Sequence, residues 1–208
     1  MTRRSHHSES KLPVRELLSD QVSAEEVAVI LRELSRTNEV AGDVVEFGCY
    51  VGTTSVYLAR HLRQLSHKTL HVYDSFMGLP PKTSHDESPA GVQFTAGELA
   101  ATKKQFIHNF RKAQLPLPHI TKAWFNELTP NDVPPCISFA FLDGDYYHSI
   151  LDPLNLIWPN LSPGAIVVVD DYANEALPGA ARAVNEWLES HTATFRYEAS
   201  LAILQIPK

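Results

Sequence analysis

Apolar residues recur along the chain in two alternating patterns, short continuous runs and longer runs at helical spacing. The short runs, rich in β-branched residues, predict strands at 43–47, 69–73, 119–125, 137–142 and 165–170. Helical spacing lies before and between them, at 24–37, after Gly52, and at 98–113, 146–158 and 178–188. The order of elements is therefore an alternation of strands and helices.

Local signals support several of these helices. Ser23 and Glu26 have the spacing of a capping box, which predicts a helix start directly after Ser23. Pro178 suits the first turn of the helix at 178–188. In the run 98–113, helical spacing places Leu99 and Phe106 on one face.

The alternation predicts an α/β fold with a mainly parallel sheet and helices on both faces. The run 165–170 is apolar on both faces, as a central parallel strand is. The last two strand-like runs, 194–199 and 201–206, are nearly contiguous and must form a hairpin, so one of them runs antiparallel. We expect a doubly wound, seven-stranded sheet closed by this C-terminal hairpin.

Domain organisation follows from length and composition. A chain of 208 residues suits one domain, which we expect at 21–208, after a flexible N-terminal segment at 1–20. The stretch 75–97 is rich in Pro, Gly and Ser and lacks periodicity, which is typical of a lid or a binding loop. A second irregular connection is expected at 126–136.

Charge and composition exclude several classes of function. The net charge of −6 disfavours nucleic acid as the main partner. No stretch approaches the roughly 18 apolar residues of a membrane-spanning helix, and the N-terminus lacks the apolar region of a secretory signal. Cys49 and Cys136 are too few for a disulfide framework. We therefore expect a cytoplasmic protein with no membrane and no nucleic-acid partner.

Ligands of a parallel α/β sheet bind at the carboxyl ends of its strands. The first strand ends in VVEFGCYVGTTS, where Gly48 and Gly52 allow the backbone to approach a ligand at a helix N-terminus. The dinucleotide pattern G-x-G-x-x-G is absent. Glu46 lies within the apolar strand, where a carboxylate needs a partner. A cationic ligand and a paired structural glutamate are both open explanations.

The next two strand ends carry further candidates. Asp74 ends the second strand and can accept hydrogen bonds from two ribose hydroxyls, although a helix cap or turn would use the same residue. Trp124 and Phe125 end the third strand. They could flank an adenine ring or simply pack in the core.

Acidic residues gather at the last two parallel strand ends. Asp143 and Asp145 bracket Gly144 after the fourth strand, and Asp170 and Asp171 end the fifth. Adjacent strands would bring these carboxylates together, where they repel unless a cation lies between them. Oxygen ligands favour Mg²⁺, Ca²⁺ or Mn²⁺ over zinc. The alternative is that one acid caps a helix, for which Asp145 is the candidate, while the others are solvated.

Four blocks together resemble the macrocin O-methyltransferase family (TylF/MycF-like), which are class I S-adenosylmethionine-dependent enzymes with a Rossmann-like fold. The resemblance covers about residues 43 to 190. The blocks are VVEFGCYVGTTSVYLARHL, VYDSFMGLPP, FLDGDYYHSILDPLNLIWPNLSPGAIVVVDDY and PGAARAVNEWL. The first and third are more distantly similar to catechol-type O-methyltransferases, which bind Mg²⁺ through acids at these strand ends.

The resemblance implies roles for individual residues. Glu46, Gly48 and Gly52 would cradle the methionine part of S-adenosylmethionine, with Asp74 on the ribose. The expected cofactor contacts also include residues next to these positions and residues at the ends of the third and fourth strands: Cys49, Tyr50, Thr53, Ser75, Trp124, Phe125 and Asp143. Asp143, Asp170 and Asp171 would bind Mg²⁺ or another divalent cation.

The function expected from these features is methyl transfer to a hydroxyl of a small metabolite, such as a sugar or diol of a natural product. Asp143 and His148 are the candidate bases, although His148 could equally be a surface histidine. Two alternatives are a non-catalytic cofactor-binding domain of the same fold and a metal-dependent phosphoesterase. The oligomeric state is left open by the sequence, and a homodimer is one possibility.

Overall fold

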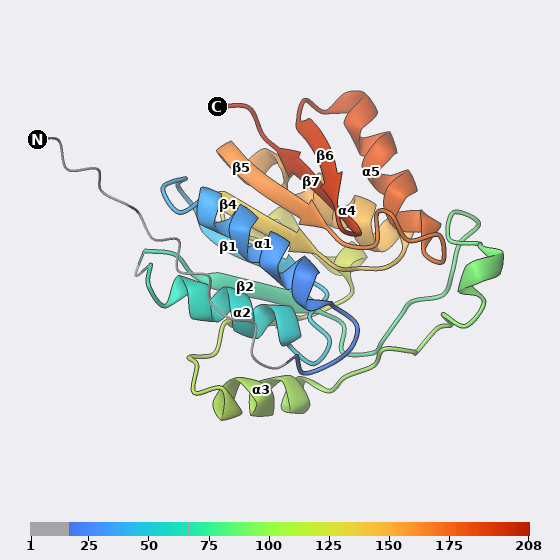
Figure 1. The fold of residues 1–208 in the computed structure, drawn as a ribbon, viewed down its shortest axis with the longest axis horizontal. Coiled ribbons are helices and arrows are strands. Elements are labelled where there is room, and N and C mark those ends of the chain that lie inside the picture. The colour runs from blue at the N-terminus through green and yellow to red at the C-terminus, as the bar shows by residue number, and fades with distance from the viewer. Residues whose placement is uncertain (1–16, 66) are drawn as a thin grey trace, which may run out of the picture.

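The computed structural model describes residues 17–65 and 67–208, which form a seven-stranded sheet with helices on both faces (Figure 1). The strand order is β3-β2-β1-β4-β5-β7-β6. The strands are β1 Asp43–Phe47, β2 Leu70–Asp74, β3 His119–Lys122, β4 Ile137–Leu142, β5 Leu161–Val169, β6 Thr194–Glu198 and β7 Leu201–Gln205. Most of the expected flexible segment, residues 1–16, lies outside the described residues.

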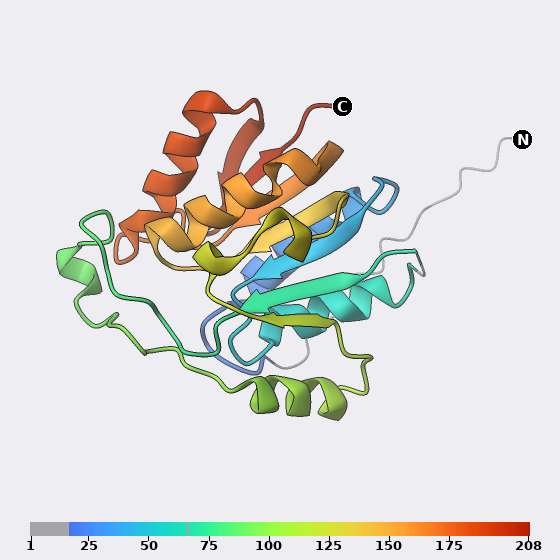
Figure 2. The same ribbon diagram turned by 180° about the vertical axis from the view of Figure 1, so that it is seen from behind.

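Two hydrophobic cores lie on the two faces of the sheet. The helices are α1 Ala24–Arg36, α2 Thr53–Leu62, α3 Lys103–Lys112, α4 Tyr147–Ile157 and α5 Pro178–Ser190. Buried residues of α1, α2 and α3 pack on one face and those of α4 and α5 on the other. Figure 2 shows α4 (orange) and α5 (red) in front of the sheet. The predicted doubly wound architecture is confirmed.

The five strands β1 to β5 pair in parallel, and the chain winds outward in both directions from the neighbours β1 and β4. β7 pairs antiparallel with both β5 and β6, which confirms the C-terminal hairpin. The boundary between β1 and β4 is the topological switch point, where ligands of such sheets bind.

Three expected elements differ by three residues or more from their bounds in the structure. β5 begins at Leu161, four residues before the expected start at 165. β3 ends at Lys122, and Trp124 and Phe125 instead begin a short 3₁₀ turn. The third helix begins at Lys103 after its cap Thr102. Leu99 lies outside that helix, at a φ of +55°, and packs beside Tyr146 and Leu177. The apolar residue Leu99 therefore continues the helical spacing because it packs against Tyr146 and Leu177, and not because it lies in the helix.

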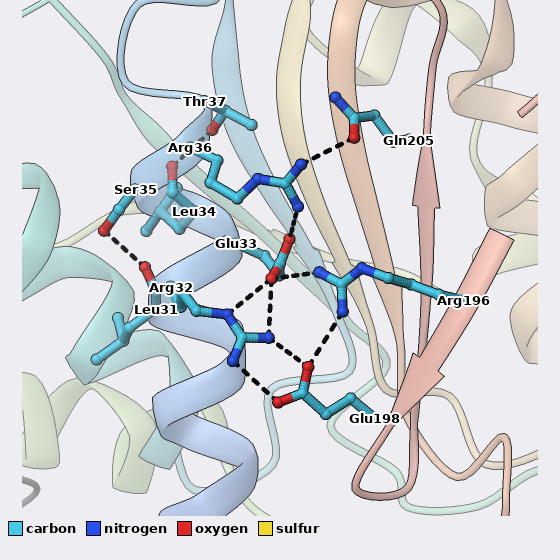
Figure 3. A network of polar contacts seen from close by, with 10 residues as sticks. All are labelled: Leu31, Arg32, Glu33, Leu34, Ser35, Arg36, Thr37, Arg196, Glu198 and Gln205. Atoms are coloured by element: carbon cyan, nitrogen blue, oxygen red, sulfur yellow. Dashed lines mark hydrogen bonds and ion pairs between the residues drawn. The ribbon is translucent and has the colours of Figure 1, made fainter. Parts of the chain in front are cut away.

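Helix α1 begins where the sequence predicts and is joined to the hairpin by charged side chains. Ser23 and Glu26 form the capping box. Figure 3 shows Glu33 of α1 between arginine side chains, with Arg36 from the same helix and Arg196 from β6. Arg36 Nη1 and Arg196 Nη2 each lie 2.5 Å from a Glu33 oxygen. These contacts attach the C-terminal edge of the sheet to the first helix.

In the described part of the chain, every helix is too short or too polar to cross a membrane.

Candidate active site

A cavity of about 950 Å³ opens at the carboxyl ends of the strands around the switch point. Its walls come from the β1–α2 turn, the ends of β2 and β4, the 75–97 loop and the segment after β5. A smaller cavity of about 20 Å³ lies beside it, between the β1–α2 turn and residues 19–22. Both candidate regions of the sequence, the glycine turn and the acidic strand ends, therefore share one site.

The β1–α2 turn needs glycine at two positions. Gly48 has a φ of +83°, and a Cβ on it would lie 1.9 Å from the carbonyl oxygen of Asp143. Gly52, the N-cap of α2, has a φ of +90°, and a Cβ there would lie 2.9 Å from the ring of Phe106. Glycine thus lets the turn lie against the end of β4 and start α2 facing the cavity.

Asp74 fixes this turn to the end of β2. Its Oδ2 accepts hydrogen bonds from the backbone N–H groups of Cys49 and Tyr50, at 2.8 and 3.1 Å, and its Oδ1 accepts one from Phe76 at 2.7 Å. A carboxylate has about four lone-pair sites. Asp74 lines the cavity and keeps capacity for a further donor, so a ribose contact stays a prediction that its geometry permits.

Glu46 is almost completely buried in β1 and lines the smaller cavity. Burial raises its pKa to about 8, against the lowering effect of a hydrogen bond donated by Ser55. The smaller cavity brings together six of the residues expected to bind the cofactor: Glu46, Gly48, Cys49, Tyr50, Thr53 and Asp143. Ser75, Trp124 and Phe125 line the larger cavity with Asp74.

Three carboxyl groups converge at the ends of β4 and β5. One oxygen each of Asp143, Asp145 and Asp171 lies within 4.8 Å of the others. Burial is the main cause that raises the pKa of all three, and neighbouring carboxylates raise those of Asp143 and Asp145 further. A cation between them would remove both effects, so the donor set fits a divalent ion with oxygen ligands.

Asp170 is buried beside this cluster rather than within it. Its Oδ1 accepts hydrogen bonds from Asp171 N at 2.8 Å and from Ser200 Oγ at 3.2 Å. Burial, followed by the charge of Asp171, raises its pKa well above the ordinary value. Its role as a metal ligand stays a prediction, and the geometry adds Asp145 as a third candidate oxygen ligand beside Asp143 and Asp171.

The β4–α4 turn explains why Asp145 faces this cluster. Tyr146, not Asp145, is the N-cap of α4, and Asp145 has a φ of +64°. A Cβ on Gly144 would lie 2.4 Å from the carbonyl oxygen of Ser149. Pro153 cannot donate a backbone hydrogen bond to that carbonyl. Gly144 is therefore needed for a close approach of the turn to α4, rather than for a positive φ.

His148 is in the first turn of α4 and lines the cavity, with its side chain 58% exposed. Its Nδ1 lies 3.6 Å from Asp152 Oδ1. The structure therefore places both candidate bases, Asp143 and His148, in the same cavity.

Several wall residues had no signal in the sequence. Asp20 and Gln21 line the larger cavity, and Ser19 Oγ lies 3.1 Å from Thr53 Oγ1. Residues 19 and 20, expected to belong to a flexible segment, therefore contact the site. Across the cavity, the 75–97 loop contributes Leu79 and Phe94, which pack with residues near α4 and α5.

The charge of the lining is one-sided. Carboxyl side chains surround the cavity, whereas no lysine or arginine of the described residues lines it. S-adenosylmethionine carries two positive charges, on its sulfonium and ammonium groups, and one negative charge, on its carboxylate, so its net charge is positive. The lining therefore complements the cofactor and a divalent cation.

The sheet order, the glycine turn after β1 and the acids after β4 and β5 define the chain as a class I, Rossmann-like methyltransferase fold. The model of the family "Macrocin-O-methyltransferase (TylF)" matches residues 24–197. The chain belongs to this family.

Relatives of known name share part of their length with this chain. It is 33% identical over 144 residues, 66% of the chain, to the 8-demethyl-8-(2,3-dimethoxy-alpha-L-rhamnosyl)-tetracenomycin-C 4'-O-methyltransferase of Streptomyces olivaceus, and covers 55% of it. It is 28% identical over 162 residues, 73% of the chain, to the mycinamicin III 3''-O-methyltransferase of Micromonospora griseorubida, and covers 62% of it. The chain thus spans less than two thirds of these relatives.

Solved structures confirm the fold. The O-methyltransferase NovP superposes with a TM-score of 0.76 at 24% identity, over 88% of this chain and 80% of that one. The calicheamicin methyltransferase CalS11 superposes with a TM-score of 0.73 at 19% identity, over 86% of this chain and 77% of that one.

Proposed function

We propose that the protein is an S-adenosylmethionine-dependent O-methyltransferase that methylates a hydroxyl of a natural-product sugar or related diol. The observation that carries this proposal is the shared cavity, in which the glycine turn after β1 faces the carboxyl cluster after β4 and β5. Family membership and the names of the relatives support it.

The cofactor would lie along the β1–α2 turn. Its methionine part would lie in the larger cavity at the side that borders the smaller one, near Glu46 and Thr53, and its ribose would lie near Asp74. Trp124 and Phe125 would bound the adenine. Asp143 lines both cavities and would therefore lie between the cofactor and the methyl acceptor.

A divalent cation such as Mg²⁺ would be held by Asp143, Asp145 and Asp171, with Asp170 as a further candidate. When bound, it supplies positive charge that lowers the pKa of an acceptor hydroxyl. The raised pKa values of the carboxyl groups support a cation-binding role for the cluster.

The reaction is an in-line displacement. The acceptor oxygen forms a bond to the methyl carbon as the carbon–sulfur bond breaks, and the sulfonium becomes the neutral thioether of S-adenosylhomocysteine. The acceptor loses its hydroxyl proton to a base. Asp143 and His148 are the two candidates in the cavity, and positioning the reactants supplies much of the rate.

The lining also bears on the charge of the acceptor. Because the described residues place carboxyl groups, and no lysine or arginine, around the cavity, a neutral glycoside fits it better than a sugar that carries a diphosphate. The proposed acceptor is therefore a glycoside that carries no diphosphate and has adjacent hydroxyl groups.

The test measures S-adenosylhomocysteine formation with a glycoside panel consisting of mycinamicin III, demethyldecarbamoylnovobiocin and methyl α-L-rhamnoside, and with TDP-rhamnose as the anionic counterpart. We expect turnover of at least one panel member in the presence of Mg²⁺, loss with EDTA, and weaker turnover of TDP-rhamnose. Calorimetry with S-adenosylhomocysteine measures cofactor binding separately. Absence of cofactor binding would contradict the proposed function, and activity in EDTA would remove the metal from it.

A pair of variants separates the two candidate bases. Asp143→Asn and His148→Gln are compared for turnover as a function of pH, with cofactor binding as the control. Loss of activity in His148→Gln with retained Mg²⁺ binding assigns proton transfer to His148. Full activity in His148→Gln leaves Asp143 as the base.

A further inference from the structure

Asp86 is an acidic residue of the 75–97 loop that is buried, with 2% of its surface exposed. Its Oδ2 accepts hydrogen bonds from the backbone N–H and the hydroxyl of Thr83, at 2.9 and 2.8 Å. Its Oδ1 accepts a hydrogen bond of 2.7 Å from the backbone N–H of Tyr147. One carboxyl group therefore closes a turn of the loop and binds the first residue of α4.

The neighbouring helix leaves room for this contact. A Cβ on Gly179, in the first turn of α5, would lie 2.1 Å from Asp86 Oδ1 and 2.5 Å from Tyr147 N. The first N–H groups of a helix have no partner inside the helix. Asp86 thus accepts a hydrogen bond from the N–H group of Tyr147 at the start of α4. A side chain at Gly179 of α5 would occupy the space in which this hydrogen bond forms.

Two further side chains, those of His85 and Glu186, contact Tyr147. The ring of His85, next to Asp86, stacks on it with centroids 4.1 Å apart, and its hydroxyl donates a 2.5 Å hydrogen bond to Glu186 of α5. Tyr147 lies between Asp145 of the carboxyl cluster and the candidate base His148. A displacement of Tyr147 would therefore move the segment that carries both.

The same loop also forms one wall of the cavity. Leu79, Phe94 and Leu99 pack with Tyr146 and Leu177, and we call these five residues the lid wall. Tyr146 Oη donates a 3.1 Å hydrogen bond to the carbonyl of Phe94. Figure 1 shows the loop (green) running from β2 to the N-terminal end of α5 and back to α3.

The loop also contacts α5 and the segment before it through hydrogen bonds to backbone carbonyl groups. Ser88 Oγ donates to the carbonyl of Glu175 at 2.7 Å, and Arg182 Nη1 donates to the carbonyl of His85 at 2.5 Å. Asp86 differs from these contacts because it reaches the first turn of α4, beside the acids.

The lid wall is separate from one part of the expected cofactor site, the smaller cavity, whereas Asp74, Ser75, Trp124 and Phe125 line the larger cavity together with it. The smaller cavity is lined by Ser19, Gln21, Val22, Glu46, the β1–α2 turn and Asp143, and includes none of the lid wall. A displaced loop would therefore alter the space for the acceptor before it altered the smaller cavity.

We propose that Asp86 is a positioning residue for the methyl acceptor: it fastens the 75–97 loop to α4 and thereby fixes the lid wall and the Asp145–His148 turn together. This inference rests on the proposed function for its link to the acceptor. Its structural part, the fastening of the loop to α4, is measurable without turnover.

The chain offers a matched control for this residue. Asp132 makes the same local pattern, because its Oδ2 accepts from Thr129 N and Thr129 Oγ1 at 2.8 and 2.6 Å. It is exposed and does not line the cavity. Asp132→Ala therefore removes an equivalent turn without removing a contact to α4.

The experiment compares Asp86→Ala, Asp86→Asn and Asp132→Ala. For Asp86→Ala we expect the KM for an accepted member of the glycoside panel to rise about tenfold or more, because misplaced reactants lose effective concentration. The affinity for S-adenosylhomocysteine should fall much less, since six of the expected cofactor contacts line the smaller cavity, which includes none of the lid wall. Asp86→Asn keeps one acceptor oxygen and gives an intermediate KM. Asp132→Ala matches the parent protein.

Hydrogen exchange supplies the readout that does not need turnover. Asp86→Ala should exchange faster at the Tyr147 amide and across 83–91, whereas Asp132→Ala should not. Unchanged exchange there, or equal losses of acceptor and cofactor binding, would overturn the proposal. If the protein binds the cofactor but methylates no panel member, the proposed acceptor class is contradicted. Faster exchange in Asp86→Ala alone would still support the role of Asp86 in fastening the loop.

Discussion

Gly48 and Gly97 show how the same backbone conformation serves different purposes. Both have a φ near +85°, at +83° and +87°. A Cβ on Gly48 would lie 1.9 Å from the carbonyl of Asp143, whereas a Cβ on Gly97 would have nothing within 4 Å. The first glycine is needed for both conformation and space, the second for conformation alone.

We predict that Gly97→Ala lowers the free energy of unfolding by about 1 kcal/mol, the cost of a left-handed alanine. Gly48→Ala should cost about 3 kcal/mol or more, because the backbone of Asp143 must also move. Urea denaturation of both variants measures the difference. Equal costs would contradict the close approach of the β1–α2 turn to β4.

Glu46 gives a prediction on pH. Burial holds its pKa at about 8, above the ordinary value of 4.5, so the neutral form is favoured in the folded protein. The stabilisation from this group is complete below about pH 4.5 and is lost as the pH rises through about 8. Glu46→Gln should therefore raise the thermal midpoint of the cofactor-free protein at pH 8 more than at pH 5.

The same variant should bind S-adenosylhomocysteine more weakly, since it removes the carboxyl group beside the expected ammonium position. Thermal melts at both pH values and calorimetry measure the two effects. A parallel shift at both pH values would assign the gain to packing rather than to ionisation.

At the scale of elements, α1 and the C-terminal hairpin are joined by a charged network (Figure 3). The side chain of Glu33 is fully buried, whereas those of Arg36 and Arg196 remain 43% and 40% exposed. Burial alone would raise the pKa of Glu33, but hydrogen bonds from Arg196, Arg36 and Arg32 outweigh it and lower the pKa. Its stabilisation is therefore present above the ordinary pKa and lost as the pH falls through the lowered one.

We predict that Glu33→Gln lowers the free energy of unfolding at pH 7 by about 2 kcal/mol, a value reduced for the exposure of the arginines. Glu198→Gln, in the same network but 42% exposed, should cost less than about 1 kcal/mol. Denaturant unfolding at pH 7 and pH 4 measures both. The difference between the variants should shrink at pH 4. A larger loss in Glu198→Gln would contradict the central place of Glu33.

The elements that the sequence predicts well are those whose signals are local. Apolar runs place β1, β4 and β5, and the capping box of Ser23 places the start of α1. The start of α3 was misplaced because Leu99 continues the helical spacing while packing against Tyr146. Local periodicity cannot distinguish a helix face from a contact with another element.

The candidate site shows the same division. The glycine turn, Asp74 and the acids at the strand ends follow from the parallel fold, because strand ends converge at one edge. Asp86 could not be predicted, since its partner Tyr147 lies 61 positions away in the chain. The orientation of Asp145 depends on the approach of Gly144 to Ser149, which only the packed turn reveals.

At the scale of the whole molecule, the larger cavity is lined by carboxyl side chains and by no lysine or arginine of the described residues. Asp143, Asp145 and Asp171 have raised pKa values, with burial as the first cause in each. Groups with raised pKa values stabilise the fold at low pH, and this contribution is lost as the pH rises. The cofactor-free protein should therefore lose stability toward neutral and alkaline pH, unless a cation neutralises the cluster.

A series of thermal melts with either EDTA or millimolar Mg²⁺ measures this linkage. In EDTA the midpoint should fall between pH 5 and pH 8. Mg²⁺ should reduce the fall, because an ion that binds only the folded state stabilises it by mass action. Asp145→Asn removes one repelling charge, so its thermal midpoint in EDTA should fall less between pH 5 and pH 8 than that of the parent protein. It also removes one candidate ligand, so its midpoint should respond less to Mg²⁺. Asp132→Asn, which changes an exposed aspartate outside the cavity, should behave as the parent protein. Identical curves in EDTA and Mg²⁺ for the parent protein would mean that the carboxyl cluster binds no cation, and that its charge is balanced by protons alone.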